Sequence, residues 1–185
     1  MLQNSLIDRL NPLPAAVPLH QCRIVQNPLR LGVTSLDTLV SAAWKSLRSE
    51  TGHRTILFRK HDLGDAYCDA GLLQQVFVNL LANSIRHTLG RNPAVLQVGS
   101  FLREGEQVVF VRDNGTGFDE RYGDQGDTGR SIATVTGIVH NHGGRIWSNP
   151  GAGREATFYF TLGAPATVQR SLPHGVANRK RLNSR

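Results

Sequence analysis

The chain has 185 residues, of which 39% are hydrophobic and 19% are charged, so it is long enough to bury one sizeable core. No stretch approaches the length of a membrane-spanning helix, and the first residues lack the basic and apolar pattern of a secretory signal. These features predict a cytoplasmic protein with no membrane segment. The two cysteines, Cys22 and Cys68, cannot form a multi-bridge disulfide framework and lack metal-ligand spacing.

The formal net charge is +7, from 21 Lys and Arg against 14 Asp and Glu, which alone would suggest an anionic partner. The excess lies in the flanks of the chain. Residues 1–60 hold eight basic and three acidic side chains, and residues 170–185 hold five basic and no acidic ones. Residues 61–169 hold eight basic and eleven acidic side chains, a balance of −3. We therefore expect no nucleic-acid partner, and we predict a basic, disordered tail over residues 164–185.

Hydrophobic spacing predicts three helices and five strands. Four prolines interrupt the pattern near the N-terminus, so residues 1–33 are expected to form an irregular segment or the remnant of a preceding helical region. Ser35 and Asp69 precede the first two helical patterns and are candidate N-caps. The predicted elements, in chain order, are a helix over residues 34–48, a strand over 55–59, a helix over 69–88, strands over 94–102 and 107–113, a helix over 131–141, and strands over 145–148 and 156–162.

The order of these elements predicts the architecture. The strands over residues 94–102 and 107–113 flank a short turn and are predicted to form an antiparallel hairpin. Helices grouped against a mixed, largely antiparallel sheet make a two-layer α/β sandwich of the α+β class, with the helices on one face. We assign residues 34–163 to this domain.

Two asparagines lie four residues apart in the otherwise apolar second helix. Asn79 and Asn83 therefore share a helix face, although asparagine has poor helix propensity. One interpretation is that both residues mark the solvent side of the helix. The alternative is that they point into a site, where an amide oxygen can ligate a hard cation such as Mg²⁺.

A carboxylate and two glycines lie at the end of the predicted strand over residues 107–113. Asp113 ends this strand, and Gly115 and Gly117 come directly after it. Glycine permits close backbone approach to a ligand or a positive φ angle, whereas the plainer interpretation is an Asx-type turn. A carboxylate here would accept the hydrogen bonds that an exocyclic adenine amine donates.

Further along, His142 precedes two glycines and most simply belongs to the turn that ends the third helix.

In their order and spacing, these clusters resemble the ATP-binding domain of sensor histidine kinases, which belongs to the larger Bergerat-fold family with gyrase, Hsp90 and MutL. The resemblance covers roughly residues 28–163. Residues 73–88 are similar to the family's N box, and residues 113–117 are similar to its G1 box. The ATP-binding residues that the resemblance implies are Asn83, Arg86, His87, Asp113, Gly115, Gly117, Phe118, Gly129, Arg130, Ser131 and Thr157.

The resemblance also implies a role for several of these residues. Asn83 would hold Mg²⁺, and Arg86 would occupy the position of a phosphate-contacting basic residue. Asp113 would bind the adenine amine, with Thr157 supporting it through a water. Asn79 stands where ATP-hydrolysing relatives carry a glutamate base, so it is the candidate catalytic residue, and a gyrase-like ATPase is disfavoured.

The similarity is weaker after the G1 box. Family members carry a long ATP lid, with an aromatic F box, that ends in a glycine-rich G2 box. Here only Gly129 keeps its glycine, and no F box is found between Phe118 and Thr128. Arg130 could supply charge, and Ser131 could offer a free backbone N–H at the start of the third helix. The sequence therefore predicts a shortened lid.

A complete histidine kinase also carries a reactive histidine on a dimerising helical hairpin. That hairpin is not recognisable in residues 1–30. His20 lacks a helical context, and His61 is predicted to be a solvated loop residue. The expected partners are therefore ATP, a histidine-bearing dimerisation domain and a response regulator, with any homodimer formed through the missing hairpin.

The sequence leaves three functions open. The first is a Mg²⁺-dependent kinase domain that transfers the γ-phosphoryl group of ATP to a histidine outside this segment. The second is a degenerate, non-catalytic module that binds nucleotide weakly or not at all. The third is a serine kinase of the anti-sigma type, which resembles the same domain and lacks the histidine hairpin.

Overall fold

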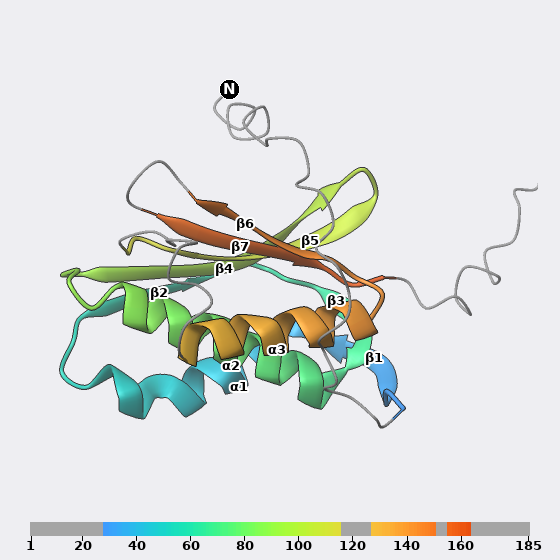
Figure 1. The fold of residues 1–185 in the computed structure, drawn as a ribbon, viewed down its shortest axis with the longest axis horizontal. Helices are drawn as coiled ribbons and strands as arrows, with labels where there is room; N and C mark the ends of the chain where they lie inside the picture. The colour runs from blue at the N-terminus through green and yellow to red at the C-terminus, as the bar shows by residue number, and fades with distance from the viewer. Residues whose placement is uncertain (1–27, 116–126, 151–154, 164–185) are drawn as a thin grey trace, which may run out of the picture.

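The computed structural model describes residues 28–115, 127–150 and 155–163. These residues form two layers, a sheet and a set of helices that cover one of its faces (Figure 1). The helices are α1 (Leu36–Leu47), α2 (Ala70–His87) and α3 (Asp127–Asn141), with a short 3-10 helix, η1 (Arg48–Thr51), after α1. The main sheet contains β2 (Ile56–Lys60), β4 (Ala94–Arg103), β5 (Glu106–Asp113), β7 (Ala156–Thr161) and β6 (Ile146–Pro150), in that spatial order.

The pairing of the strands confirms the predicted sandwich. β2 and β4 are parallel, because α2 lies between them in sequence and returns the chain to the same end of the sheet. All other pairs in this sheet are antiparallel, and β4 and β5 form the predicted hairpin. In that hairpin Leu96 lies opposite Asp113, which places the end of β5 beside the first part of β4.

A second, two-stranded sheet was not predicted. β1 (Leu31–Ser35) pairs antiparallel with β3 (Asp65–Asp69), so the chain is already regular before residue 34. Both strands have only five residues, and Val33 and Tyr67 are exposed. Because a large apolar side chain is exposed in each strand, the hydrophobic pattern gives no clear strand signal.

The core lies between the main sheet and the helices. Phe77 of α2 meets Phe160 of β7 edge-on, with ring centroids 5.8 Å apart. At the other end, Trp44 of α1 stacks on Phe58 of β2 at 4.3 Å. The apolar side chains of the predicted second helix are buried here, and the fully buried ones are Leu73, Val76, Phe77, Leu80 and Leu81. Within the described ranges, no helix is long and apolar enough to cross a membrane.

The start of α2 is capped as the sequence predicted. The Asp69 carboxylate accepts hydrogen bonds from the backbone N–H groups of Gly71 (3.1 Å) and Leu72 (3.2 Å). The backbone N–H of Arg30 donates to the same carboxylate and lowers the pKa of Asp69. Ser35 also occupies an N-cap position, before α1, but its side chain makes no capping hydrogen bond. The prediction of Ser35 as a cap is therefore right in place and wrong in the interaction.

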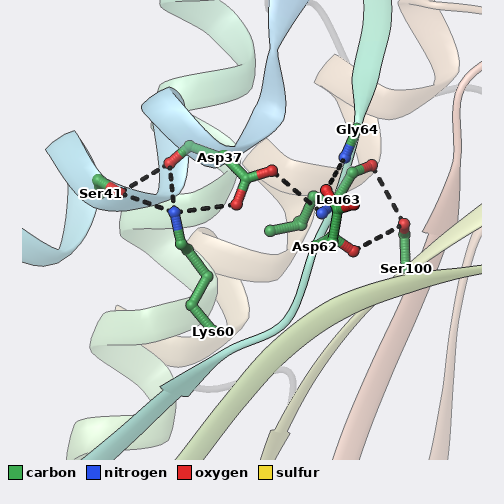
Figure 2. Close-up of polar contacts among 7 residues, drawn as sticks. All are labelled: Asp37, Ser41, Lys60, Asp62, Leu63, Gly64 and Ser100. Carbon is green, nitrogen blue, oxygen red and sulfur yellow. Dashed lines mark hydrogen bonds and ion pairs between the residues drawn. The ribbon is translucent and has the colours of Figure 1, made fainter.

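The loop that follows β2 fixes the start of α1 (Figure 2). Lys60 forms an ion pair with Asp37 at 2.9 Å, and its hydrogen bond lowers the pKa of the Asp37 carboxyl. The other oxygen of Asp37 accepts the backbone N–H of Leu63 at 3.1 Å. Ser100 of β4 donates to the carbonyl of Leu63 at 3.1 Å. The loop therefore joins α1 to the sheet, with the Leu63 side chain buried beneath it. His61 in this loop is exposed, as predicted.

His142 belongs to the turn after α3, as predicted, and it also joins two helices. Its Nε2 accepts the backbone N–H of Asp69 at 3.0 Å, so this ring nitrogen carries no proton. Its Nδ1 donates to the carbonyl of Ile138 at 2.8 Å. A buried imidazole thus connects the end of α3 to the N-cap of α2.

A cation caps the other end of α2. Arg54, just before β2, donates from its guanidinium to the carbonyls of Ile85 and Thr88. A positive charge is favourable at a helix C-terminus, where carbonyl groups lack intrahelical partners.

We expect Arg54→Ala to lower the free energy of unfolding by about 1–2 kcal/mol, measured by urea denaturation. Arg59→Ala, which removes an exposed arginine of β2, is the matched control, and equal losses in the two variants would contradict the capping role.

Candidate functional site

The C-terminal half of α2 carries a buried amide without a hydrogen-bond partner. Asn83 is 1% exposed, and neither its Oδ1 nor its Nδ2 is hydrogen-bonded to any described residue. A buried polar group left in this way costs about 1–3 kcal/mol, so such a group in a native protein needs an explanation. Asn79, one turn earlier, is half-buried. The interpretation that both residues mark the solvent side of the helix is therefore wrong for Asn83.

A buried carboxylate ends the central strand β5. Asp113 is 3% exposed, and its Oδ1 accepts the backbone N–H of Gly115 at 2.9 Å. Burial raises the pKa of the Asp113 carboxyl, while hydrogen bonds from Gly115 and from the Ser84 side chain, together with the nearby His87, lower it. The bond to Gly115 is the predicted Asx-type turn, but an ordinary surface turn would not bury its carboxylate. The remaining lone pairs of the carboxylate are available to a ligand that donates hydrogen bonds.

The turn after Asp113 needs glycine because the backbone of α2 lies against it. A Cβ atom at Gly115 would lie 2.6 Å from the carbonyl oxygen of His87 and 2.7 Å from Oδ1 of Asp113. Both distances are shorter than any normal contact, so a side chain at this position would push the strand end away from the helix. The glycine is therefore explained by close packing against α2, without a positive φ angle, and the predicted approach of a ligand to the backbone stays a prediction.

Two further residues hold this turn in place. Asn114 accepts the backbone N–H of Val95 at 2.8 Å and donates to the carbonyl of Pro93, which ties the turn to the start of β4. Arg91, in the loop after α2, donates to the carbonyl of Gly115 at 2.9 Å. Sequence reasoning did not find the role of Arg91, because nothing in a loop arginine reveals a partner 24 residues away.

The other predicted residues of α2 lie on the same end of the helix. Arg86 is exposed, and His87 is half-buried beside Asp113 and Gly115. Together with Asn83, they occupy the last two turns of α2. The structure therefore brings the N-box residues and Asp113 to one end of the sandwich, where α2 meets the end of β5.

Thr157 does not lie on the face of the sheet that its predicted role requires. The strand register pairs Asp113 with Ala156 and Arg112 with Thr157. Successive side chains of a strand point to opposite faces of the sheet, so Thr157 shares a face with Arg112 and points away from Asp113. The expected support of Asp113 by Thr157 through a water is therefore wrong. The residue opposite Asp113 is an alanine, which has no hydroxyl group.

The start of α3 also differs from the prediction. The helix begins at Asp127, four residues before the predicted start, so Gly129, Arg130 and Ser131 all lie inside it. The backbone N–H of Ser131 is therefore within the helical ladder and is not free to bind phosphate. The Ser131 hydroxyl is buried and has no hydrogen-bond partner among the described residues. The predicted contributions of Gly117 and Phe118 lie outside those residues.

A small hollow on the other side of the Asp113 backbone is not the candidate site. Its volume is about 70 Å³, and the Arg112–Glu155 ion pair forms part of its wall. Sites for nucleotide-sized ligands measure about 300–1,000 Å³. The hollow can therefore hold only water or a small ion.

The donor set of the site fits a magnesium ion that is bound mostly by its own ligands. The described residues contain no group of three or more His, Cys, Asp or Glu that could form a protein cage for a metal. Mg²⁺ usually keeps several waters and is held by one or two protein oxygens together with substrate phosphates. Oδ1 of Asn83, which has no hydrogen-bond partner among the described residues, would be one such oxygen.

The fold and the site together define a class: an ATPase-type two-layer sandwich with a buried carboxylate at the end of a central strand and a buried amide on the adjacent helix. The profile of the histidine kinase-, DNA gyrase B-, and HSP90-like ATPase family matches residues 68–166. The chain belongs to this family.

The relatives and the solved structures agree with this assignment. The chain is 28% identical to cyanobacterial phytochrome A of Nostoc sp. over 167 residues, which cover 83% of this chain and 20% of that protein. It is 31% identical to cyanobacterial phytochrome B of the same organism, with 78% and 21% covered. The chain thus spans about a fifth of the length of these relatives.

Among solved structures, histidine kinase AdeS of Acinetobacter baumannii superposes with a TM-score of 0.62 at 19% identity, covering 75% of this chain and 69% of that chain. The catalytic domain of histidine kinase ThkA gives a TM-score of 0.58 at 19% identity, covering 72% of this chain and 96% of that chain. The fold is therefore that of a histidine kinase catalytic domain.

The raised pKa of Asp113 gives a pH dependence with a definite sign. Because the folded-state pKa lies above the ordinary value of 3.8, the folded chain holds this proton more tightly than the unfolded chain does. The Asp113 carboxyl therefore stabilises the folded protein at pH values below its unfolded-state pKa. This stabilisation is lost as the pH rises through the folded-state pKa.

We expect the stability advantage of Asp113→Asn over the wild type to grow as pH rises through the folded-state pKa, and then to level off. Urea denaturation of both proteins between about pH 4 and about pH 8 measures this difference, and other titrating groups cancel in it. A difference that is constant over the whole range would contradict the buried, raised carboxyl.

Proposed function

We propose that this chain is the ATP-binding catalytic domain of a sensor histidine kinase, and that it transfers the γ-phosphoryl group of Mg-ATP to a histidine on a separate dimerisation domain. The observation that carries the proposal is the pair of buried polar groups, Asp113 and Asn83, at the end of the sandwich. The first is a carboxylate that accepts the backbone N–H of Gly115 and has further lone pairs, and the second is an amide with no hydrogen-bond partner among the described residues. A ligand with an amine and a metal-bound polyphosphate would satisfy both.

In this proposal the domain acts by positioning and by charge. Asp113 accepts the exocyclic amine of adenine, and Gly115 keeps the turn that carries Asp113 packed against the backbone of α2. Mg²⁺ on Asn83 would neutralise charge on the phosphate oxygens. Arg86, exposed at the end of α2, and Arg130 offset the charge that develops during transfer.

The proposal requires no strong general base. The attacking imidazole is itself a nucleophile, and Asn79 carries an amide, which cannot remove a proton at neutral pH. Phosphoryl transfer depends mainly on alignment and charge stabilisation. The proposed partners are ATP, the histidine-bearing domain and, after transfer, a response regulator.

A chimaera tests the transfer step. The chain replaces the ATP-binding domain behind the dimerisation hairpin of a complete histidine kinase, and the fusion is incubated with radiolabelled Mg-ATP. We expect acid-labile, alkali-stable label, as phosphohistidine gives, and no label on the same chimaera with Asp113→Asn. Saturable ATP binding without any label, in a chimaera whose parent hairpin is labelled by its own domain, would contradict the kinase proposal.

One observation favours the second candidate, an interaction module that binds nucleotide weakly. α3 begins early, so the backbone N–H expected to bind phosphate at Ser131 is part of the helix. A thermal shift with Mg-ATP separates the two candidates, because a ligand that binds the folded state raises its melting temperature. A saturable shift supports the kinase domain, and none at millimolar Mg-ATP supports the module.

A further inference from the structure

His142 is a buried imidazole that the proposed site does not use. It is 7% exposed and lies in the turn after α3. Its Nε2 accepts the backbone N–H of Asp69 at 3.0 Å, and its Nδ1 donates to the carbonyl of Ile138 at 2.8 Å. The first bond joins residues 73 positions apart, whereas the second stays within the end of α3. The imidazole therefore makes one contact between elements and one local contact.

Asp69 offers the first of these bonds from a fixed position. Its carboxylate caps α2 through the backbone N–H groups of Gly71 and Leu72. Its backbone also pairs with Leu31 of β1 in the small sheet. A hydrogen bond from this residue to His142 therefore ties the end of α3 to the start of α2.

The turn that carries His142 is held on the main sheet. Gly143 has a φ angle of +73°, which favours glycine. A Cβ atom at Gly144 would overlap with the carbonyl oxygen of Thr161 in β7. The backbone N–H of Gly144 donates to the carbonyl of Val139 at 3.0 Å, which closes the end of α3. The imidazole thus extends from a fixed turn toward a fixed helix start.

The end of α3 that is opposite the imidazole lies near the candidate site. α2 and α3 pack side by side with opposite directions, because the end of α3 meets the start of α2 (Figure 1). Ser131 lies eleven residues before His142, and Asn83 lies fourteen residues after Asp69. With a rise of about 1.5 Å per residue, these separations are roughly 17 Å and 21 Å along the two helices. The start of α3 is therefore level with the part of α2 that carries Asn83.

A directional contact is needed to fix α3 along α2. The residues that α3 contributes to the buried core are apolar: Val135, Ile138 and Val139. Apolar burial stabilises the contact but is not directional, and packed helices can shift by about 1–2 Å against one another. A hydrogen bond has a defined length and angle. The bond to Nε2 of His142 therefore selects one position of α3 along α2.

We propose that His142 is a positioning residue for the nucleotide site: its bond with Asp69 fixes α3 along α2, so that the start of α3 stays beside Asn83. This inference rests on the proposed ATP-binding function and concerns the part of the ligand near Asn83, which is the metal-bound polyphosphate. His142 does not touch the ligand. It acts through the position of α3.

Two substitutions of His142 separate its two hydrogen bonds. In His142→Gln, the side-chain amide reaches the place of Nε2 and can accept the N–H of Asp69. In His142→Asn, the shorter amide can replace Nδ1 as the donor to Ile138 but does not reach Asp69. We expect His142→Asn to weaken Mg-ATP binding about tenfold, the loss of one hydrogen bond, and His142→Gln to stay within about threefold of the wild type. Calorimetry on the full chain measures both.

Hydrogen exchange shows how firmly α3 is held when no nucleotide is present. For the backbone amides of residues 131–137, we expect exchange about tenfold faster in His142→Asn than in the wild type, and unchanged exchange in His142→Gln. The amides of β4 and β5 should keep their protection. His140→Asn makes the same change at an exposed position of α3, so it is the matched control and should behave as the wild type in both measurements.

The outcomes separate this inference from the function on which it rests. If exchange follows the expected pattern but the wild type does not bind Mg-ATP, the positioning of α3 is supported and the proposed function fails. If the wild type binds Mg-ATP and His142→Asn binds it equally well, the function stands and the inference is overturned. A larger loss in His142→Gln than in His142→Asn would show that His142 only caps α3. Lost protection throughout the sheet would make the imidazole a general core residue, and either result would also overturn the inference.

Discussion

Asp113→Asn is expected to weaken ATP binding by at least about a hundredfold, which corresponds to about 3 kcal/mol. The asparagine oxygen can still accept the backbone N–H of Gly115, so the amide NH₂ group turns toward the adenine amine. Two donors then face each other in a buried site, where neither can bind water. Calorimetric titration with Mg-ATP measures the loss.

The fold should survive this change. Asp113 is a buried carboxylate whose pKa burial raises, so its replacement by a neutral group of the same shape removes a desolvation cost at neutral pH. Asp65→Asn, which changes an exposed carboxylate of β3, is the matched control and should bind ATP as the wild type does. Wild-type affinity in a folded Asp113→Asn variant would remove Asp113 from the site.

Asn83→Leu is expected to abolish Mg²⁺-dependent ATP binding and, at the same time, to stabilise the protein without ligand. The substitution removes the amide oxygen proposed as the metal ligand. It also replaces a buried amide that has no partner among the described residues by an apolar group of similar size. Relief of the unsatisfied amide should raise the free energy of unfolding by about 1 kcal/mol, or the melting temperature by about 3 °C.

These two effects have opposite signs, which distinguishes a ligand-binding asparagine from a structural one. Gln75→Leu makes a similar polar-to-apolar change on the exposed side of α2 and should change neither property. Thermal unfolding with and without Mg-ATP gives both quantities in one experiment. A destabilised Asn83→Leu protein that still binds Mg-ATP would show that the amide serves the fold and not the metal.

Most of the fold could be predicted from local sequence patterns. The apolar stripe of α2, its Asp69 cap and the β4–β5 hairpin could be predicted because each is encoded within about twenty neighbouring residues. β1 and β3 could not be predicted, because each exposes a large apolar residue and each is defined by pairing with the other across thirty or more positions. The early start of α3 was missed because a glycine at 129 suggested a loop rather than a helical turn.

The residues of the candidate site also divide into those that local sequence patterns reveal and those that depend on distant contacts. Asn83 and Asp113 could be predicted as site residues because each is a polar residue within, or at the end of, an otherwise apolar segment. The face on which Thr157 lies depends on the register of β7 against β5, and a shift of one residue reverses it. Arg91 and Asn114 act through partners in other elements. Only the packed structure reveals such contacts.

The central claim is that Asp113 and Asn83 form one site for an adenine nucleotide and its magnesium ion. Calorimetric titration of the wild-type chain with ATP, first with excess Mg²⁺ and then with excess EDTA, tests it most directly. We predict saturable binding with a stoichiometry near one that weakens at least about tenfold when Mg²⁺ is removed. Absence of saturable binding in both buffers, or an affinity that Mg²⁺ does not change, would contradict the claim.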